Sequence, residues 1–102
     1  MARSARLESG FQDRLKTTLK DMFPGCKVVK MDQIQGIPDL LILFGEKWAV
    51  LETKRTESAP HRPNQDYYVD LMNEMSFARF IYPENKEEVL SALTEFFERT
   101  DN

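Results

Sequence analysis

The sequence has one cysteine, one histidine and no long hydrophobic run among its 102 residues. A single cysteine excludes an internal disulfide and fits a reducing compartment, so we expect a cytoplasmic protein, in the host-cell cytoplasm if it is viral. Zinc sites built from clusters of His and Cys are excluded too. No apolar run approaches the roughly 20 residues of a membrane span, and the segment around Arg3 and Arg6 lacks the apolar part of a signal peptide. We therefore expect no membrane association.

Basic charge is also scarce, with 14 Lys and Arg against 17 Asp and Glu and a net charge of −3. Because phosphate binding generally uses a basic surface, this balance argues mildly against nucleic-acid binding. The charges are uneven, however. Residues 84–101 hold six acids and two bases, whereas residues 47–62 hold Lys47, Lys54, Arg55, His61 and Arg62 against two acids. A basic margin beside an acidic remainder is therefore expected.

Length and composition predict one soluble globular domain, residues 1–102, with one core. Apolar residues at helical spacing predict helices over residues 5–23 and 63–75, and a last helix after a capping-box pattern at residues 85–88. Their apolar stripes are Leu7, Phe11, Leu15, Leu19 and Met22; Tyr68, Leu71, Met72 and Met75; and Val89, Leu90, Leu93, Phe96 and Phe97.

Four strands are expected, over residues 26–31, 39–44, 47–54 and 77–82. The second is apolar on both faces, which indicates a central strand covered on both sides. Cys26 is expected to be a core residue. The pattern predicts an α/β fold with a mixed central sheet of about four strands and helices on both faces.

Two of these strands form a hairpin with its turn at Gly45-Glu46, which places Asp39 roughly opposite Glu52. Since strand side chains alternate, Glu52 and Lys54 share a face and Thr53 points away from them. Charges beside a core are costly unless they are paired or bound to a metal, so the cluster indicates a functional site.

The residues Gly36-Ile37-Pro38-Asp39-Leu40, followed by Glu52-Thr53-Lys54, resemble the signature of the PD-(D/E)xK nucleases. They are most similar to the VRR-NUC and Holliday-junction-resolvase-like branch, over roughly residues 7–82. The resemblance implies a restriction-endonuclease-like αβββαβ core, here with an added C-terminal helix. It also implies a DNA endonuclease specific for branched or junction DNA.

Magnesium chemistry suits this residue set, with Mn²⁺ able to substitute. Mg²⁺ prefers one or two carboxylates plus waters, so Asp39 and Glu52 are the best ligands, and the Thr53 backbone carbonyl completes the shell. Lys54 would hold the attacking water and offset phosphate charge. No Gly-rich phosphate loop or Ser-His-Asp arrangement points to an organic cofactor or to acyl chemistry.

Two further polar residues face inward on the predicted helices. Glu8 falls within the apolar arc of the first helix, and the resemblance implies a metal-binding glutamate there. Gln65 lies beside Met72 on the second helix. A satisfied glutamine at the core edge is one interpretation, while the resemblance implies a catalytic residue that orients water or contacts the phosphate. His61, in a polar loop, is expected to be solvated or part of a turn.

Three functions compete. The first is a catalytic Mg²⁺-dependent endonuclease. The second is a non-catalytic nucleic-acid-binding or assembly subunit that keeps the nuclease fold. The third is an interaction module in which Lys54 forms a structural salt bridge with Asp39 or Glu52.

A homodimer is expected because one small domain offers one site, whereas a junction or duplex has two strands to cut. The resolvase-like relatives are commonly dimers. The candidate interfaces are the edge of the strand at residues 77–82 and the aromatic end of the last helix, Phe96 and Phe97; alternatively, these aromatics cap the core of a monomer.

Overall fold

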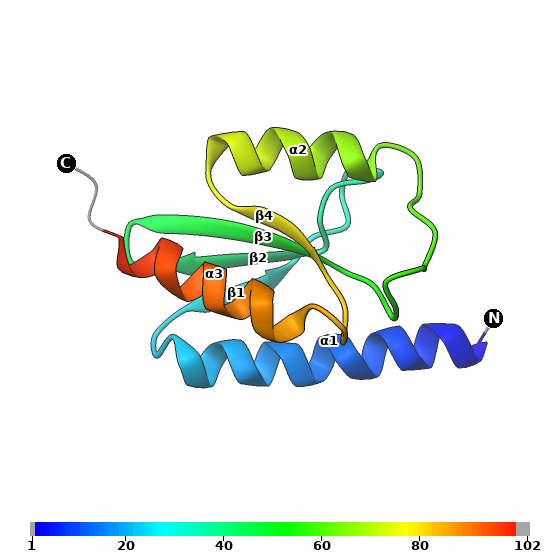
Figure 1. The fold of residues 1–102 in the computed structure, drawn as a ribbon, viewed down its shortest axis with the longest axis horizontal. Coiled ribbons are helices and arrows are strands. Elements are labelled where there is room, and N and C mark those ends of the chain that lie inside the picture. Colours follow the sequence, from blue (N-terminus) through cyan, green and yellow to red (C-terminus); the bar gives the residue numbers. More distant parts are fainter. Residues whose placement is uncertain (1, 100–102) are drawn as a thin grey trace.

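The structure is a computed structural model that describes the backbone of residues 2–99 and the side chains of residues 10–99. Its elements, in chain order, are α1 (Ala2–Met22), β1 (Lys27–Lys30), β2 (Leu40–Phe44), β3 (Lys47–Thr53), α2 (Gln65–Met75), β4 (Ala78–Ile81) and α3 (Lys86–Glu98). The predicted α/β class, with a four-stranded mixed sheet and three helices, is confirmed (Figure 1).

The strands lie in the order β1-β2-β3-β4, antiparallel except for β3 and β4, which are parallel. Gly45, with φ 62°, occupies the turn between β2 and β3. Leu40 pairs with Leu51, so the same register places position 39 opposite position 52, as the sequence predicted. The hairpin therefore sets Asp39 beside the end of β3.

The two faces of the sheet are covered unequally. Helices α1 and α3 cover one face and build a large core around residues such as Leu19, Ile42 and Leu93 (Figure 1). On the other face α2 packs on β3 and β4, and the core there has only three buried members, Val50, Val69 and Ala78. The expectation that β2 is covered on both sides is wrong. Helix α2 connects β3 to β4 and packs on those two strands, so it does not cover β2, and Leu43 is 42% exposed.

Helix α2 is rotated and shortened relative to the prediction. It begins at Gln65 rather than residue 63, because Asn64 adopts a left-handed backbone, φ 72°, that does not continue a helix. Gln65 and Val69, one turn apart, face the sheet. Leu71 and Met75, expected in the core, are therefore exposed.

The outer edge of β4 is occupied by side chains of the same chain. Asn73 Oδ1 accepts from the Ala78 N–H at 3.1 Å, Asn85 Nδ2 donates to the Phe80 carbonyl at 3.0 Å, and Asn85 Oδ1 accepts from the Tyr82 N–H at 2.8 Å. The predicted capping box is wrong. The Asn85 amide forms hydrogen bonds with the backbone of residues 80 and 82, and it makes no side-chain cap on α3. An edge bonded in this way is a poor template for a second strand.

The aromatic end of α3 is mostly internal. Phe97 is buried and its ring lies 5.0 Å from that of Phe23 and 5.3 Å from that of Phe44. Phe96 is partly buried against the same core. Of the alternatives for these aromatics, the structure favours capping of the core over an interface. Met22, expected in the stripe of the first helix, is 40% exposed.

Gly36 fixes the loop that leads into β2 against the loop that leads into α2. Its φ is +90°, and an added Cβ would lie 2.7 Å from Asn64 Cβ and 2.8 Å from the Pro63 carbonyl oxygen. We expect Gly36→Ala to lower the free energy of unfolding by more than about 2 kcal/mol, because left-handed strain and backbone overlap add. Urea denaturation measures the change.

Gly25 supplies the matched control, because its φ is also +90° but an added Cβ meets nothing within 4 Å. Gly25→Ala should show the backbone strain alone, about 1 kcal/mol. Equal losses in the two variants would contradict the close approach at Gly36.

Candidate active site

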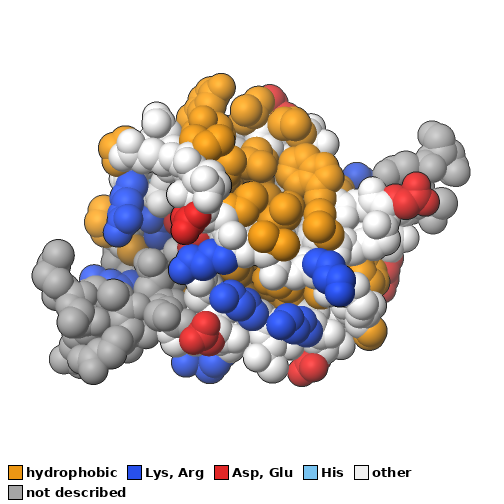
Figure 2. Space-filling view, turned by 180° about the vertical axis from the view of Figure 1, so that it is seen from behind, with side chains coloured by type: hydrophobic (Ala, Val, Ile, Leu, Met, Phe, Trp, Pro, Cys, Tyr) orange, Lys and Arg blue, Asp and Glu red, His pale blue; other side chains and the backbone are white. Residues whose placement is uncertain are grey.

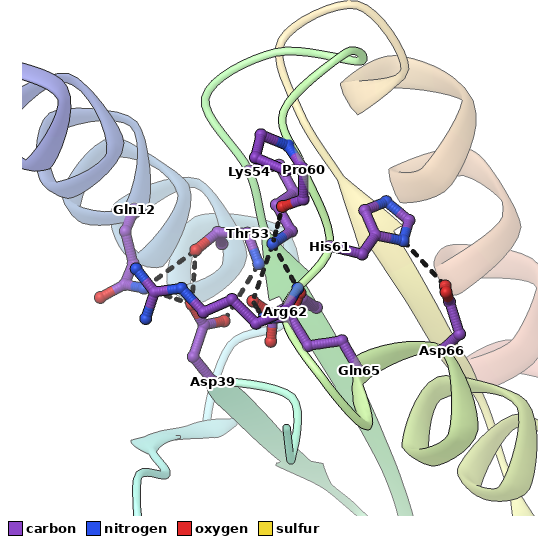
Figure 3. Close-up of polar contacts among 10 residues, drawn as sticks. Gln12, Asp39, Thr53, Lys54, Pro60, His61, Arg62, Gln65 and Asp66 are labelled. Atoms are coloured by element: carbon purple, nitrogen blue, oxygen red, sulfur yellow. Dashed lines mark hydrogen bonds and ion pairs between the residues drawn. The ribbon is translucent and has the colours of Figure 1, made fainter. Parts of the chain in front are cut away.

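Five of the predicted site residues gather where β3 ends: Asp39, Glu52, Thr53, Lys54 and Gln65. Side chains from the two opposite faces of the sheet meet there, Gln12 from α1 and Gln65 from α2 (Figure 3). Thr53 faces α1, since its hydroxyl accepts a hydrogen bond from Gln12 Nε2 at 3.0 Å. Glu52 and Lys54 face α2, where both contact Gln65. The predicted alternation is therefore confirmed, and the side chains of Glu52, Thr53 and Lys54 are all buried.

Asp39 stands immediately before β2 and turns its carboxylate toward Thr53. Its Oδ1 accepts from the Thr53 backbone N–H at 3.0 Å, and its Oδ2 accepts from the Thr53 hydroxyl at 2.7 Å. Gln12 Nε2 also donates to Oδ2, at 3.0 Å. These contacts orient the carboxylate from both the strand and α1, so Asp39 is held in place by residues that are themselves buried.

Gln65 connects the charged pair on the other face. Its Oε1 accepts from Lys54 Nζ at 2.6 Å and from the Arg62 N–H at 2.8 Å, while its Nε2 donates to Glu52 Oε2 at 2.9 Å. Lys54 Nζ also donates to the Pro60 carbonyl at 3.1 Å and lies 4.0 Å from Glu52 Oε2. An ammonium has three donors, and these hydrogen bonds use two of them. Gln65 is thus a bonded member of the cluster, as a satisfied glutamine at the core edge would be, and the catalytic role that the resemblance implies stays a prediction.

The Thr53 carbonyl is left without a ladder partner by Pro38. The Lys54 N–H donates to β4, at Ile81, so the backbone groups of Thr53 point the other way, toward β2. If the β2–β3 register is extended by two residues beyond the Leu40–Leu51 pair, Pro38 falls opposite Thr53, and proline has no N–H to donate. The Asp39 carboxylate takes the Thr53 N–H instead. A carbonyl in this position suits the role of metal ligand predicted for Thr53.

A pocket of about 690 Å³ lies at this end of β3, and Thr53 is not among the residues that line it. Asp39, Glu52, Lys54 and Gln65 all contribute to its wall, together with Gln12. Three further bases line it, Lys30, Arg55 and Arg62; the last two belong to the predicted basic margin, whereas Lys47 and His61 of that margin do not line the pocket. The pocket therefore combines carboxylates, which can bind a metal ion, with basic side chains, which can bind a phosphate. Metal-dependent cleavage of a phosphodiester requires both.

Mg²⁺ binds oxygen donors, and the residues at the end of β3 supply several of them. Among the side chains of residues 10–99, no three His, Cys, Asp or Glu lie close enough together to hold a metal on their own. Asp39, Glu52 and the Thr53 carbonyl are nevertheless all oxygen donors, and Mg²⁺ typically takes one or two carboxylates and keeps several waters. The set fits Mg²⁺ or Mn²⁺. The Glu8 backbone belongs to α1, but its side chain lies outside the described residues, so its metal role stays a prediction.

Two residues have contacts that the sequence interpretation did not anticipate. Gln12 lies one turn after Glu8 on the same face of α1. This spacing could have predicted that Gln12 also faces the site. His61 Nδ1 lies 2.8 Å from Asp66 Oδ1, and its ring stacks on Phe80 with centroids 4.1 Å apart. Because its neighbours Pro60 and Arg62 both bond the site, His61 anchors the loop that carries them.

Cys26 is a core residue, as predicted. It is buried, and its Sγ lies 3.7 Å from the Leu19 carbonyl. Burial raises the pKa of the Cys26 thiol, against smaller opposing effects of Lys20 and Lys27. The thiol is therefore protonated at neutral pH, which does not suit a nucleophile.

Comparisons with protein-family models, with curated proteins and with solved structures gave no match to this chain. Among the helices in the described part of the chain, none is long and apolar enough to cross a membrane. The residue types and geometry of the pocket therefore carry the functional proposal.

Proposed function

We propose that the chain is a Mg²⁺-dependent DNA endonuclease with a restriction-endonuclease-like fold. The observation that carries this proposal is the placement of Asp39, Glu52 and Lys54 in one pocket at the end of β3. The two carboxylates are suited to bind a hard cation, and the ammonium is suited to meet a phosphate. The αβββαβ order of the elements is compatible with the same proposal.

Each residue has a distinct role in this proposal. Asp39, Glu52 and the Thr53 carbonyl would hold the ion, which, when bound, neutralises phosphate charge and activates water. The remaining Lys54 donor would bind the phosphate or orient the attacking water. Gln65 fixes the Lys54 ammonium by accepting from it at 2.6 Å, so Gln65 keeps that donor aimed in one direction.

Substrate binding is expected to be modest and salt-sensitive. The bases that line the pocket, Lys30, Arg55 and Arg62, would contact the phosphate backbone, while the net charge of the chain is −3. Contacts to phosphates hold a duplex without specifying its sequence. The resemblance favours branched or junction DNA as the substrate.

One observation favours the non-catalytic candidates, and most directly the interaction module in which Lys54 forms a structural salt bridge. Every buried side-chain nitrogen and oxygen in the described part of the chain has a hydrogen-bond partner, and Lys54 is paired with Glu52. A polar cluster that is satisfied within the chain can be retained for structure alone.

Incubation with branched, flapped, nicked and linear DNA separates the two candidates. Catalysis predicts cleavage in Mg²⁺ or Mn²⁺, none in EDTA, and little in Ca²⁺, whose looser coordination positions water poorly. The non-catalytic subunit predicts a shift of branched DNA in native gels with no cleavage in any of these ions. Cleavage that persists in EDTA would contradict the proposal.

A further inference from the structure

The loop between β1 and β2, residues 31–39, forms one wall of the candidate pocket. Four of its residues line the pocket: Met31, Asp32, Ile37 and Asp39. Ile34 is not among them, and 50% of its surface is exposed. Of the seven large hydrophobic side chains that are exposed among the described residues, Ile34 is the one that lies in a loop. The wall of the pocket therefore carries an apolar side chain that faces solvent.

Three contacts hold this loop in one conformation. The Met31 N–H donates to the Asp39 carbonyl at 2.7 Å and closes the neck of the loop. Within the loop, the Ile37 N–H donates to the Ile34 carbonyl at 3.1 Å and forms a turn. Gly36 lies against the loop that leads into α2, where an added Cβ would come within 2.8 Å of two backbone atoms. Figure 1 shows the same approach of the β1–β2 loop to the start of α2. Ile34 is therefore presented on a fixed turn.

Basic side chains lie on both segments that adjoin this turn. Lys30 directly precedes the neck of the loop, and Arg62 belongs to the loop that Gly36 contacts; both side chains line the pocket. An apolar group beside cations matches DNA, in which bases lie beside phosphates. The charge around Ile34 therefore favours a nucleic acid over an apolar protein partner.

Ile34 lies close enough to Asp39 to reach DNA that is bound in the pocket. The first and last Cα atoms of a β-turn are less than about 7 Å apart, which applies here to Ile34 and Ile37. The two residues from Ile37 to Asp39 add at most about 7 Å. Ile34 is therefore within about 14 Å of Asp39, which is about four base-pair rises of 3.4 Å.

We propose that Ile34 is a wedge that enters the base stack beside the cleaved phosphodiester, with Gln33 and Gln35 bonding the bases that it separates. This inference rests on the proposed DNA substrate. Proteins that deform DNA commonly insert isoleucine, leucine or methionine between base steps. The two exposed glutamine amides can donate to and accept from base edges. Gln33 Nε2 bonds the adjacent Asp32 at 3.3 Å, a long hydrogen bond that a base edge can replace.

The wedge should act where base stacking is already interrupted. Unstacking an intact base step costs more free energy than the burial of one half-exposed isoleucine provides. At a branch the stack is interrupted by the structure of the DNA itself, so less of this cost remains. Ile34 should therefore make the chain prefer branched DNA over a continuous duplex, without reading its sequence.

Fluorescence anisotropy in Ca²⁺, in which cleavage should be slow, tests the wedge on a branched DNA and on a linear duplex. A 2-aminopurine base beside the branch gives a second signal, because its fluorescence rises when its neighbour is unstacked. The wild type should prefer the branched DNA and raise this fluorescence. Ile34→Ser should bind the branched DNA about fivefold more weakly, because the apolar contact is lost, and should not raise the fluorescence. Ile34→Leu keeps an apolar wedge and should behave as the wild type does.

Figure 2 shows hydrophobic side chains gathered over one face of the molecule, so a control for exposure alone is needed. Leu43 supplies it, because its 42% exposure is similar and it lies at the end of β2 opposite Asp39. Leu43→Ser should bind both DNAs as the wild type does. Circular dichroism verifies that each variant is folded.

Two results would overturn the wedge. One is a folded Ile34→Ser protein that keeps both the preference for branched DNA and the fluorescence change. The other is an equal loss in Ile34→Ser and Leu43→Ser. Cleavage by the wild type in Mg²⁺ would leave the proposed function in place in both cases. A wild type that binds neither DNA would overturn this inference and the proposed function together.

Discussion

Asp39→Asn should reduce Mg²⁺-dependent cleavage at least about a hundredfold, which corresponds to about 2.7 kcal/mol of activation free energy. The variant removes the charge that would hold the metal but keeps the shape of the side chain. The Thr53 hydroxyl can donate or accept, and the Gln12 amide can turn over, so both partners of Oδ2 can bond the new amide. The free energy of unfolding should therefore stay within about 1 kcal/mol of the wild-type value.

Glu46→Gln is the matched control for Asp39→Asn. Glu46 is an exposed acid in the turn at the opposite end of the same hairpin, so its neutralisation should leave cleavage unchanged. Initial cleavage rates of a labelled DNA junction, together with urea denaturation, give both quantities. A folded Asp39→Asn protein that cleaves at half the wild-type rate or faster would remove Asp39 from the metal site.

Lys54→Met should lower the free energy of unfolding by about 3 kcal/mol and abolish cleavage. Lys54 and Glu52 are both buried, their charged atoms lie 4.0 Å apart, and both bond the same Gln65 side chain. Removing the ammonium takes away the cation that lies 4.0 Å from the buried Glu52 carboxylate. Thermal or urea unfolding at low ionic strength measures the loss.

The double variant Glu52→Gln/Lys54→Met distinguishes a broken ion pair from a general packing defect. Because it removes both charges, it should be more stable than Lys54→Met alone, with a coupling free energy of at least about 1 kcal/mol. Lys20→Met, at an exposed position on α1, should change stability by less than about 0.5 kcal/mol. Additive losses in the cycle would contradict the pairing of Lys54 with Glu52.

Local patterns predicted the elements and much of the site. Alternation along β3 placed Glu52 and Lys54 together and Thr53 opposite, and the turn at Gly45 set the register that brings Asp39 to the end of β3. These features depend on one hairpin, whose geometry follows from the chain itself. The inward direction of Gln65 followed likewise from the periodicity of α2.

Features that depend on how the elements pack were not predictable. The alternation of strand side chains does not predict the direction of the Asp39 side chain, because Asp39 precedes β2. Gln12 reaches the Asp39 carboxylate only through the packing of α1 on the sheet. The Asn85 side chain could cap α3 or form hydrogen bonds with the edge of β4, and in the structure it bonds β4. Leu43 is apolar like its neighbours, so its exposure follows only from where α2 lies.

In the proposed function, Asp39 and Glu52 together would hold a divalent ion. Mn²⁺ titration, with the free ion followed by electron paramagnetic resonance, tests it without DNA and without reference to turnover. The wild type should bind one or two Mn²⁺ in competition with Mg²⁺, and the folded Asp39→Asn/Glu52→Gln variant should lose at least about tenfold in affinity, while Glu46→Gln binds normally. Equal Mn²⁺ affinity in the wild type and the double variant would contradict the claim.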